Sequence, residues 1–326
     1  MARILVTGGA GYIGSHTVKL LLQRGHSPVV FDNLSYGYRH AVLGGDLVEG
    51  TLHDTAHLEA TLRTYQIDAV IHFAALAYVG ESVRDPLSYY HNNVAGTVSL
   101  LRAMQAVGVR HLVFSSTCAT YGIPQHTYLT EHHPQHPINP YGESKLFIEH
   151  ILQACTTAYG LRWISLRYFN AAGADPDGEL GENHDPETHL IPLVLAVANG
   201  RFPVLSIFGT DYDTPDGTCI RDYIHVTDLA DAHLLALQAL DTERANTAYN
   251  LGTGFGYSVR QVIDAAARLT GRPVPSTIVP RRAGDPPRLV AAADKARQIL
   301  GWTPHFSDLD TIIATAWRWE CRQHPR

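Results

Sequence analysis

A tyrosine and a lysine stand one helical turn apart at the start of a predicted helix. The segment PYGESKLFIEH (140–150) places Tyr141 and Lys145 at positions i and i+4, directly after a proline that is typical of a helix start. A phenol has an ordinary pKa of about 10 and is a poor base at neutral pH, but a positive charge beside it favours the phenolate. The alternative is an ordinary amphipathic helix with a surface lysine, and the surrounding sequence must decide between them.

A third group that could share a substrate proton precedes this helix. The stretch FSSTCATYG (114–122) follows a predicted strand, and Thr117 stands just past its carboxyl end, where open α/β sheets bind ligands. We expect Ser115 and Ser116 to be buried at the strand end near a cofactor, and Cys118 to act as a small buried apolar residue. Thr117, Tyr141 and Lys145 are therefore the candidate catalytic set.

A glycine-rich loop near the N-terminus is typical of dinucleotide binding. VTGGAGYIGSHT has Gly8, Gly11 and Gly14 between a strand and a helix, where backbone without Cβ atoms can approach a pyrophosphate at a helix N-terminus. Asp32 ends the next strand, about 20 residues beyond the loop, where a carboxylate binds ribose hydroxyls. A carboxylate there repels a 2′-phosphate, so the pattern favours NAD over NADP. A tight turn with a plain strand-end aspartate is the structural alternative.

Apolar runs alternate with helical patterns through the first half of the chain. Strands are predicted at 3–8, 28–32, 69–75, 111–116 and 162–169, and helices at 12–25, 55–65, 86–108 and from Tyr141 onward. This alternation predicts an α/β fold, a Rossmann-type doubly wound parallel sheet with a smaller α+β substrate-binding domain. We assign 1–170 and about 220–255 to the NAD-binding domain, and about 171–219 and 256–326 to the second. Thr227 or Asp228 is the expected N-cap of a helix within 224–240.

Composition excludes several classes of protein. The 326 residues are 45% apolar with a formal net charge of -6, which argues against nucleic-acid and anionic-membrane binding. No apolar run reaches the roughly 18 residues of a membrane span, and MARILVTGG lacks a signal-peptide pattern. The four cysteines form no CxxC pair, so we expect free thiols in a reducing cytoplasm and no metal site. The histidine-rich stretch 126–137 is predicted to be a solvated loop.

Further motifs in the same order resemble a known family over nearly the whole chain. TGGAGYIGS, FSSTCATYG and YGESK resemble the extended short-chain dehydrogenase/reductases. FDNLSYG, RYFNAAGA, the stretch from IFGTDY to IRDYIHV, and PRRAGDPP resemble the UDP-glucose (UDP-galactose) 4-epimerases among them. The resemblance implies a Rossmann domain with tightly bound NAD, a UDP-sugar substrate, and a homodimer formed through the helices at 86–108 and Tyr141.

The resemblance also implies a role for individual residues. Tyr141 matches the base, Lys145 its helper and Thr117 the hydroxyl group that assists it. The implied cofactor-binding residues are Gly8, Gly11, Tyr12, Ile13, Gly14, Asp32, Asn33, Phe73, Ala74, Ala75, Asn92, Ser115, Tyr141, Lys145 and Tyr168. The implied substrate-binding residues are Thr117, Tyr141, Asn170, His189, Leu190, Phe208, Arg221, Tyr223, Arg282 and Asp285, with both arginines on the diphosphate.

Four positions depart from the family pattern. Thr51 stands where other members have an aspartate near the adenine, and Ala77 replaces a lysine that contacts the cofactor. His189 replaces an asparagine near the substrate, and Leu289 a tyrosine that lines the sugar pocket, so a larger or altered sugar is an open alternative. A metal site made of His184, Glu187 and His189 is the less favoured interpretation, and we predict no metal.

The sequence thus predicts reversible C4 epimerisation of a UDP-sugar, first of all UDP-glucose and UDP-galactose, through a 4-keto intermediate. The counterparts for UDP-N-acetylhexosamines, UDP-pentoses or UDP-glucuronate share the scaffold. A 4,6-dehydratase is less favoured, because Thr117 is followed by Cys118 and Ala119 instead of an acidic pair. A reductase would need an exchangeable cofactor, and a non-catalytic NAD-binding scaffold would not need the intact set of Thr117, Tyr141 and Lys145.

Overall fold

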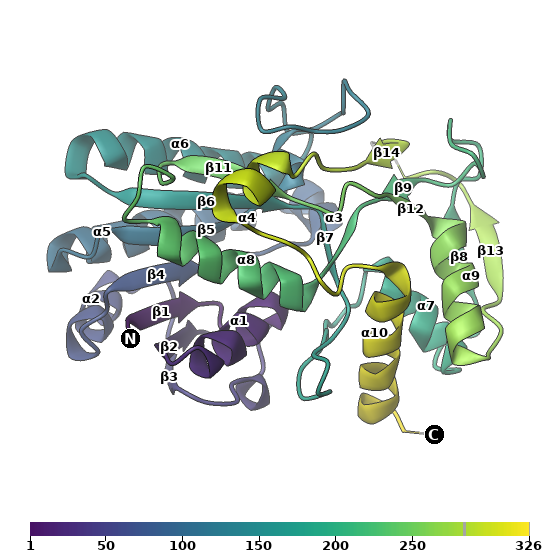
Figure 1. Ribbon diagram of the computed structural model, residues 1–326, viewed down its shortest axis with the longest axis horizontal. Coiled ribbons are helices and arrows are strands. Elements are labelled where there is room, and N and C mark those ends of the chain that lie inside the picture. Colours follow the sequence, from purple (N-terminus) through teal and green to yellow (C-terminus); the bar gives the residue numbers. More distant parts are fainter. Residues whose placement is uncertain (283–284, 326) are drawn as a thin grey trace.

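The centre of the computed structural model, which describes residues 1–282 and 285–325, is a seven-stranded parallel sheet (Figure 1). Its strand order is β11-β6-β5-β4-β1-β2-β3, so the chain winds outward in both directions from β1. The predicted doubly wound α/β fold is confirmed. The strands are β1 (Arg3–Thr7), β2 (Ser27–Asp32), β3 (Asp46–Glu49), β4 (Ala69–His72), β5 (His111–Thr117), β6 (Arg162–Tyr168) and β11 (Thr247–Leu251).

Helices cover both faces of this sheet, which explains why its strands are apolar without alternation. In β1, Ile4 and Val6 join one core cluster, and Leu5 between them joins the other. The first face carries α1 (Tyr12–Gln23), α8 (Val226–Ala239) and the π-helical turn η4 (Ala296–Leu300). The opposite face carries α2 (Thr55–Thr64), α5 (Gly96–Val107) and α6 (Pro140–Tyr159).

Two local predictions need correction. The helix expected at 86–108 consists of α4 (Pro86–Tyr89), a π-helical stretch η2 (Tyr90–Ala95) and α5, and such wide turns are often found at functional sites. The N-cap of α8 is His225, whose Nδ1 accepts a hydrogen bond from the amide of Thr227. Asp228 lies inside the helix because its carboxylate is used elsewhere: it accepts bonds from the backbone of His305 and Phe306.

A second, smaller core lies beyond the carboxyl end of the sheet. It is formed by α7 (Leu190–Ala198), α9 (Val259–Thr270) and α10 (Leu309–Gln323), which gather on the right of Figure 1. Three small sheets join it to the main one: β7 (Asn170–Ala172) with β10 (Tyr223–His225), β8 (Leu205–Phe208) with β13 (Ser276–Val279), and β9 (Ile220–Arg221) with β12 (Tyr257–Ser258) and β14 (Arg288–Leu289). The remaining short elements are η1 (Arg39–Ala41), α3 (Val79–Arg84) and η3 (Cys118–Thr120).

The division into two domains stays a prediction. Residues Ala293, Ala296, Leu300 and Trp302, which the sequence analysis assigns to the second domain, pack in the core cluster of the main sheet. Trp302 is fully buried there, and its indole N–H donates to the backbone oxygen of Asp228 in α8. The chain therefore passes from the second core at α9 back to the first core at residues 293–302, and then returns to the second core at α10.

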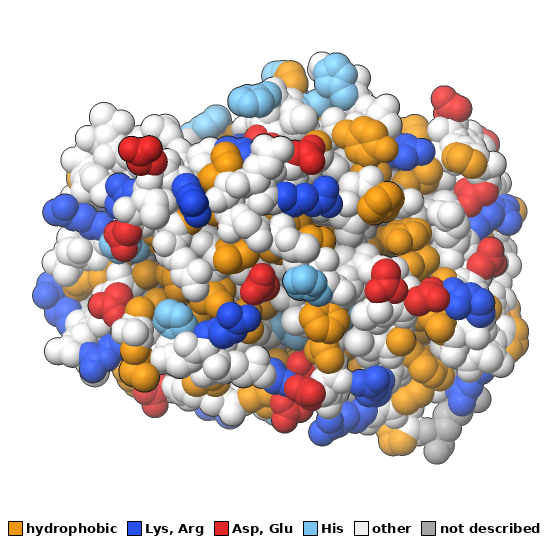
Figure 2. Space-filling view, viewed as in Figure 1, with side chains coloured by type: hydrophobic (Ala, Val, Ile, Leu, Met, Phe, Trp, Pro, Cys, Tyr) orange, Lys and Arg blue, Asp and Glu red, His pale blue; other side chains and the backbone are white. Residues whose placement is uncertain are grey.

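The surface carries charges of both signs. Figure 2 shows basic and acidic side chains interspersed on one face of the molecule, with histidines gathered at the upper edge over the loop between η3 and α6. This loop contains the histidine-rich stretch 126–137, which forms no helix or strand among the described residues. Nowhere in residues 1–282 and 285–325 is there a helix long and apolar enough to cross a membrane.

We expect the protein to lose stability between pH 6.5 and pH 4. His72, His225 and His233 are at most 1% exposed, and burial lowers the pKa of His72 to about 3 and of the other two to about 4. The unfolded chain, with histidine pKa values of about 6.5, therefore binds more protons in this window, so the free energy of unfolding falls as the pH falls. Each histidine should cost on the order of 2 kcal/mol at pH 5 relative to pH 7, measured by urea unfolding.

The variant His233→Gln tests whether buried histidines cause this loss of stability at low pH. Its Nε2 is buried without a hydrogen-bond partner among the described residues, so a neutral amide fits there with little loss. The drop in unfolding free energy between pH 7 and pH 5 should shrink by about 2 kcal/mol in this variant. The exposed His132→Gln should keep the full drop. An unchanged drop in both variants would show that other groups cause the acid sensitivity.

Candidate functional site

The glycine loop between β1 and α1 is too tight for side chains at two of its positions. Gly8 has a φ of +71°, and a Cβ there would lie 2.6 Å from the amide nitrogen of Ala74. A Cβ on Gly14 would lie 2.2 Å from the carbonyl oxygen of Gly8. No side chain among the described residues caps α1 at Gly11, so its first amide groups keep their partial positive charge available for an anion.

Asp32, at the carboxyl end of β2, points at this loop. Its carboxylate accepts hydrogen bonds from the amides of Ala10 (3.0 Å) and Leu34 (2.8 Å). Burial raises the pKa of Asp32, and these two bonds oppose the rise. Asn33 next to it is exposed, and its side-chain oxygen accepts a bond from the amide of Ser35. The structure thus brings Asp32 to the glycine loop, as the spacing predicted.

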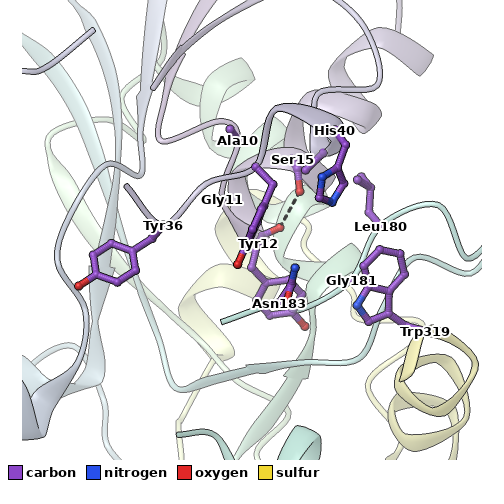
Figure 3. A pocket seen from close by; sticks show the side chains of 12 residues that line it. Ala10, Gly11, Tyr12, Ser15, Tyr36, His40, Leu180, Gly181, Asn183 and Trp319 are labelled. Atoms are coloured by element: carbon purple, nitrogen blue, oxygen red, sulfur yellow. Dashed lines mark hydrogen bonds between the residues drawn. The ribbon is translucent and has the colours of Figure 1, made fainter. Parts of the chain in front are cut away.

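A hollow opens on the outer side of the loop (Figure 3). One wall comes from the loop and the start of α1, the second from the segment after β2, and the third from residues 180–183 and α10. The sequence analysis named only two of the residues involved, Gly11 and Tyr12, and most of the others come from distant parts of the chain. The lining residues are Ala10, Gly11, Tyr12, Ser15, Tyr36, Tyr38, His40, Ala41, Leu180, Gly181, Asn183 and Trp319.

Tyr141 and Lys145 lie on the first turns of α6, above the end of β5. Asn139 caps this helix by accepting a hydrogen bond from the amide of Gly142 at 2.8 Å, and Pro140 occupies its first turn. The Lys145 Nζ donates to the carbonyl oxygen of Ser115 at 2.9 Å and lies 6.0 Å from the centre of the Tyr141 ring. Lys145 is thus a buried cation beside the phenol and not the surface lysine of an ordinary amphipathic helix.

Burial dominates the ionisation of both groups. It raises the pKa of Tyr141 well above the ordinary value, and the hydrogen bond with Thr117 opposes this rise only in part. It lowers the pKa of Lys145 to about 7, against the attraction of Glu149. The sequence analysis expected a positive charge beside the phenol to favour the phenolate. The protein groups alone instead raise the pKa of the phenol. A further positive charge near the phenol is therefore needed to make Tyr141 a base.

The other predicted cofactor residues follow the carboxyl ends of neighbouring strands. Phe73 and Ala74 come directly after β4, and both amides donate to the carbonyl oxygen of Thr7 in β1. Ala75 continues this segment. The hydroxyl of Tyr168, at the end of β6, lies 2.5 Å from the Ser115 Oγ, and burial raises the pKa of Tyr168 to about 12. The structure therefore brings these residues to the same edge as Thr117 and Tyr141.

Two supporting residues were missed by the sequence analysis. Asn93, the neighbour of the predicted Asn92, is fully buried, and its amide contacts both backbone groups of Leu76 and the Oγ of Ser144 in α6. It therefore connects the segment after β4 with the helix of Tyr141. Beneath Thr117, Glu149 of α6 forms a buried ion pair with Arg167 of β6. The sequence gives a sign of this pair at Glu149, because it is a charged residue at a position of the helix where an apolar residue is expected.

The predicted substrate residues form two groups in the small sheets. Asn170 and Tyr223 are direct partners in the β7–β10 pair. A guanidinium nitrogen of Arg221 lies 3.4 Å from a carboxylate oxygen of Asp285, and the Arg282 guanidinium lies 4.0 Å from the centre of the Phe208 ring. These contacts place two cations next to an aromatic ring and a carboxylate.

Arg221 links the small sheets to the catalytic set. Its positive charge acts to lower the pKa of the Cys118 thiol, although burial raises that pKa to about 12. Leu289, the partner of Arg221 in the β9–β14 pair, packs in the same apolar cluster as Cys118. Because Cys118 directly follows Thr117, both predicted substrate-side residues lie near Thr117.

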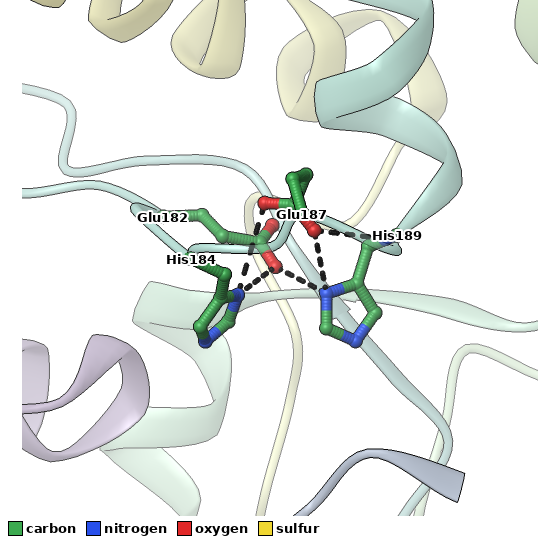
Figure 4. A group of neighbouring side chains, drawn as sticks. All are labelled: Glu182, His184, Glu187 and His189. Atoms are coloured by element: carbon green, nitrogen blue, oxygen red, sulfur yellow. Dashed lines mark hydrogen bonds and ion pairs between the residues drawn. The ribbon is translucent and has the colours of Figure 1, made fainter. Parts of the chain in front are cut away.

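His189 and Leu190 lie at the start of α7. The ring Nδ1 of His189 is 2.7 Å from an oxygen of Glu182 and 3.1 Å from one of Glu187, and that of His184 is 3.0 Å from the same Glu182 oxygen (Figure 4). Burial opposes protonation of both rings, but the carboxylates outweigh it and raise the pKa of His184 to about 9 and of His189 to about 10. Leu190 is partly buried against the second core.

The two other departures are at the surface. Thr51 follows β3 and is exposed, with its hydroxyl accepting a bond from the amide of His53. Ala77 is exposed just before α3.

Known proteins that are similar to this chain include several UDP-glucose 4-epimerases. Residues 4–252 match the NAD dependent epimerase/dehydratase family. A UDP-glucose 4-epimerase of Halalkalibacterium halodurans is 52% identical over 322 residues, 99% of this chain and 96% of that protein. The crystal structure of UDP-glucose 4-epimerase from Brucella ovis in complex with NAD is 57% identical, with a TM-score of 0.94 over 97% of this chain and 98% of that one. The enzyme from Bifidobacterium longum in complex with NAD⁺ and UDP is 40% identical, with a TM-score of 0.93 over 99% of both chains.

Proposed function

Because the chain belongs to the NAD dependent epimerase/dehydratase family, we propose that it catalyses the reversible C4 epimerisation of UDP-glucose and UDP-galactose. The observation that carries this proposal is the meeting of three groups at the carboxyl edge of the sheet. The Tyr141 phenol forms a hydrogen bond with Thr117, and the Lys145 ammonium lies beside the phenol ring. All three residues lie at the edge of the sheet that also carries the glycine loop.

The residues present fit NAD. Gly8 and Gly14 leave no room for a Cβ, so the loop backbone and the uncapped N-terminus of α1 can hold a pyrophosphate. The Asp32 carboxylate at the end of β2 is placed for the adenosine ribose, and its charge disfavours a 2′-phosphate. Bound NAD supplies reversible hydride transfer at carbon 4 of the sugar.

Tyr141 is the residue that we assign to proton transfer. The phenol oxygen, hydrogen-bonded to Thr117, takes the proton of the sugar 4-hydroxyl. It returns the proton after the 4-keto sugar has rotated to present its other face. Lys145 is anchored on the Ser115 carbonyl oxygen, so its ammonium lies at a fixed place beside the ring. The positive charges near the phenol must overcome the effect of burial, which on its own keeps the phenol protonated.

The substrate residues grip the nucleotide and leave the sugar free to rotate. We assign Arg221 and Arg282 to the diphosphate, because a guanidinium is the preferred bidentate ligand of phosphate. Asp285 and Phe208, which contact these arginines, are assigned to the uridine. Strong contacts to UDP with weak contacts to the hexose allow the ring to present either face to the same phenol.

The experiment that tests the function needs no added cofactor. The purified enzyme is incubated with UDP-galactose or UDP-glucose, and with UDP-N-acetylglucosamine, UDP-xylose and UDP-glucuronate, and the products are separated by chromatography. We expect interconversion with the highest kcat/KM for the UDP-glucose pair, and release of NAD on denaturation. Binding of UDP with no conversion of any substrate would instead indicate a non-catalytic scaffold. Loss of water from the sugar would indicate a 4,6-dehydratase.

We also propose that the protein is a homodimer and that it is located in the cytoplasm. The homodimer rests on the resemblance and on exposed apolar side chains of α3, α4 and α6, namely Val83, Leu87 and Phe147. A cytoplasmic location rests on the four cysteines, none of which forms a disulfide within the described residues.

A further inference from the structure

Four potential metal ligands converge in the segment that leads into α7. Glu182, His184, Glu187 and His189 come from a stretch of eight residues, and one ligand atom of each lies within 4.8 Å of all the others. Figure 4 shows both imidazole rings turning the Nδ1 atom toward the two carboxylates, with the other ring nitrogen facing away. Two imidazole nitrogens and two carboxylate oxygens form a donor set that zinc commonly binds.

The spacing of the ligand atoms matches a tetrahedral ion. With bonds of roughly 2.0–2.1 Å to nitrogen and oxygen, the edges of such a tetrahedron are about 3.3 Å long. Glu182 lies 3.0 Å from His184 and 2.7 Å from His189, measured between a carboxylate oxygen and each Nδ1. The Oε2 of Glu187 lies 3.8 Å from the Nδ1 of His184, and its Oε1 lies 3.1 Å from the Nδ1 of His189. These four distances bracket the tetrahedral edge, and one ligand atom of each residue lies within 4.8 Å of the others, so side-chain rotations can bring the four groups onto one ion.

The surroundings hold the carboxylates in place and leave the group accessible. The Glu182 side chain is 6% exposed, whereas that of His189 is 50% exposed, so an ion can enter from the side of His189. The Oε1 of Glu187 also accepts hydrogen bonds from the amides of Thr188 (2.7 Å) and His189 (2.8 Å). Such bonds to a ligating carboxylate orient it for a metal.

A second acidic group in the same region shows the contrast. Asp175, Asp177 and Glu179 also lie close together, but the Nζ of Lys19 already sits among them at 2.8–2.9 Å. The Lys19 ammonium offsets part of the negative charge of these three carboxylates and occupies the position between them. Within the described residues, the carboxylates of Glu182 and Glu187 form ion pairs with imidazole rings and with no lysine or arginine, and a divalent cation can take the place of the two ring protons.

We propose that Glu182, His184, Glu187 and His189 bind one divalent transition-metal ion of the zinc type. The sequence analysis considered three of these residues and predicted no metal. Glu182 is the fourth member of the group, and its backbone oxygen accepts a hydrogen bond from the indole N–H of Trp319 in α10. The ion would fix the segment between β7 and α7, so its role is structural. The ring of His184 also packs edge-on against Tyr12 of α1, which ties the site to the glycine loop.

The test measures metal binding by untagged full-length protein in the absence of substrate. After dialysis against a chelator, calorimetric titration with Zn²⁺ should show one site per chain. Glu182→Gln and His184→Gln should each weaken Zn²⁺ binding more than about 100-fold, because even outer partners of a metal site are worth about 10–100-fold. Co²⁺ in the wild-type protein should give the strong visible absorption of a tetrahedral site, and both variants should lose it.

His150→Gln is the matched control, since His150 is exposed on α6 and far from the cluster in sequence. It should bind Zn²⁺ as the wild type does. Circular dichroism in the presence of chelator checks that each variant folds, and two variants keep the test valid if one does not. Equal Zn²⁺ affinity of wild type and both variants, or no binding below millimolar Zn²⁺, would overturn the proposal. Neither result depends on epimerase activity, so the proposed function is tested separately.

Discussion

Replacing Tyr141 with phenylalanine is expected to lower kcat for UDP-galactose epimerisation about 10²–10⁴-fold, the usual contribution of a positioned acid–base group. The change removes only the phenol oxygen, which hydrogen-bonds to Thr117, and leaves the ring beside Lys145. The affinity for UDP should stay the same, because the arginines assigned to the diphosphate are on other elements. Steady-state kinetics and calorimetric titration with UDP measure the two quantities.

Tyr159→Phe makes the same chemical change at the other end of α6, where the side chain is half exposed. It should leave kcat unchanged. The pH profile adds a second criterion: the wild-type kcat should rise with pH as the phenol ionises, and Tyr141→Phe should lose this rise. If Tyr141→Phe retains kcat within a few-fold of the wild type, another group is the base.

The parts of the site that sequence could predict are those set by local geometry. The positions of Gly8 and Gly14 follow from a turn in which a Cβ would collide with backbone, and such a requirement is written into a few adjacent residues. The spacing of Tyr141 and Lys145 follows from one helical turn in the same way. The apolar strands predicted the sheet and its two covered faces because burial on both sides leaves no polar alternation.

The parts that sequence could not predict depend on contacts between distant segments. The strands β8 and β13 pair although some 70 residues separate Leu205 from Ser276, and each is too short to show a pattern alone. The capping role of His225 was missed because Asp228, a better cap by residue type, is held by a loop about 80 residues later. The four residues from Glu182 to His189 lie within eight positions of one another, but no regular helix or strand predicts that their side chains meet, and the segment is held from outside by Trp319.

Glu149 of α6 and Arg167 of β6 form a buried ion pair next to the end of β5. Arg167 donates from Nε to Glu149 at 3.0 Å and from Nη1 to the hydroxyl of Tyr121, and Ser116 donates to the same carboxylate at 2.6 Å. Arg167→Met should lower the free energy of unfolding by about 3–5 kcal/mol, because it leaves a buried carboxylate without its cation. Urea unfolding at pH 7 measures this loss.

The double variant Glu149→Leu with Arg167→Met shows how much of the lost stability comes from an unpaired buried charge and how much from lost packing. Since it removes both charges, it should recover much of the stability that Arg167→Met loses. Glu49→Gln breaks the exposed pair of Glu49 with Arg39 and should cost no more than about 1 kcal/mol. If Arg167→Met costs as little as Glu49→Gln, the pair adds nothing to stability. Should the loss be large, Glu149 is the reason that β5, with Ser116 and Thr117 at its end, keeps a fixed position against the helix of Tyr141.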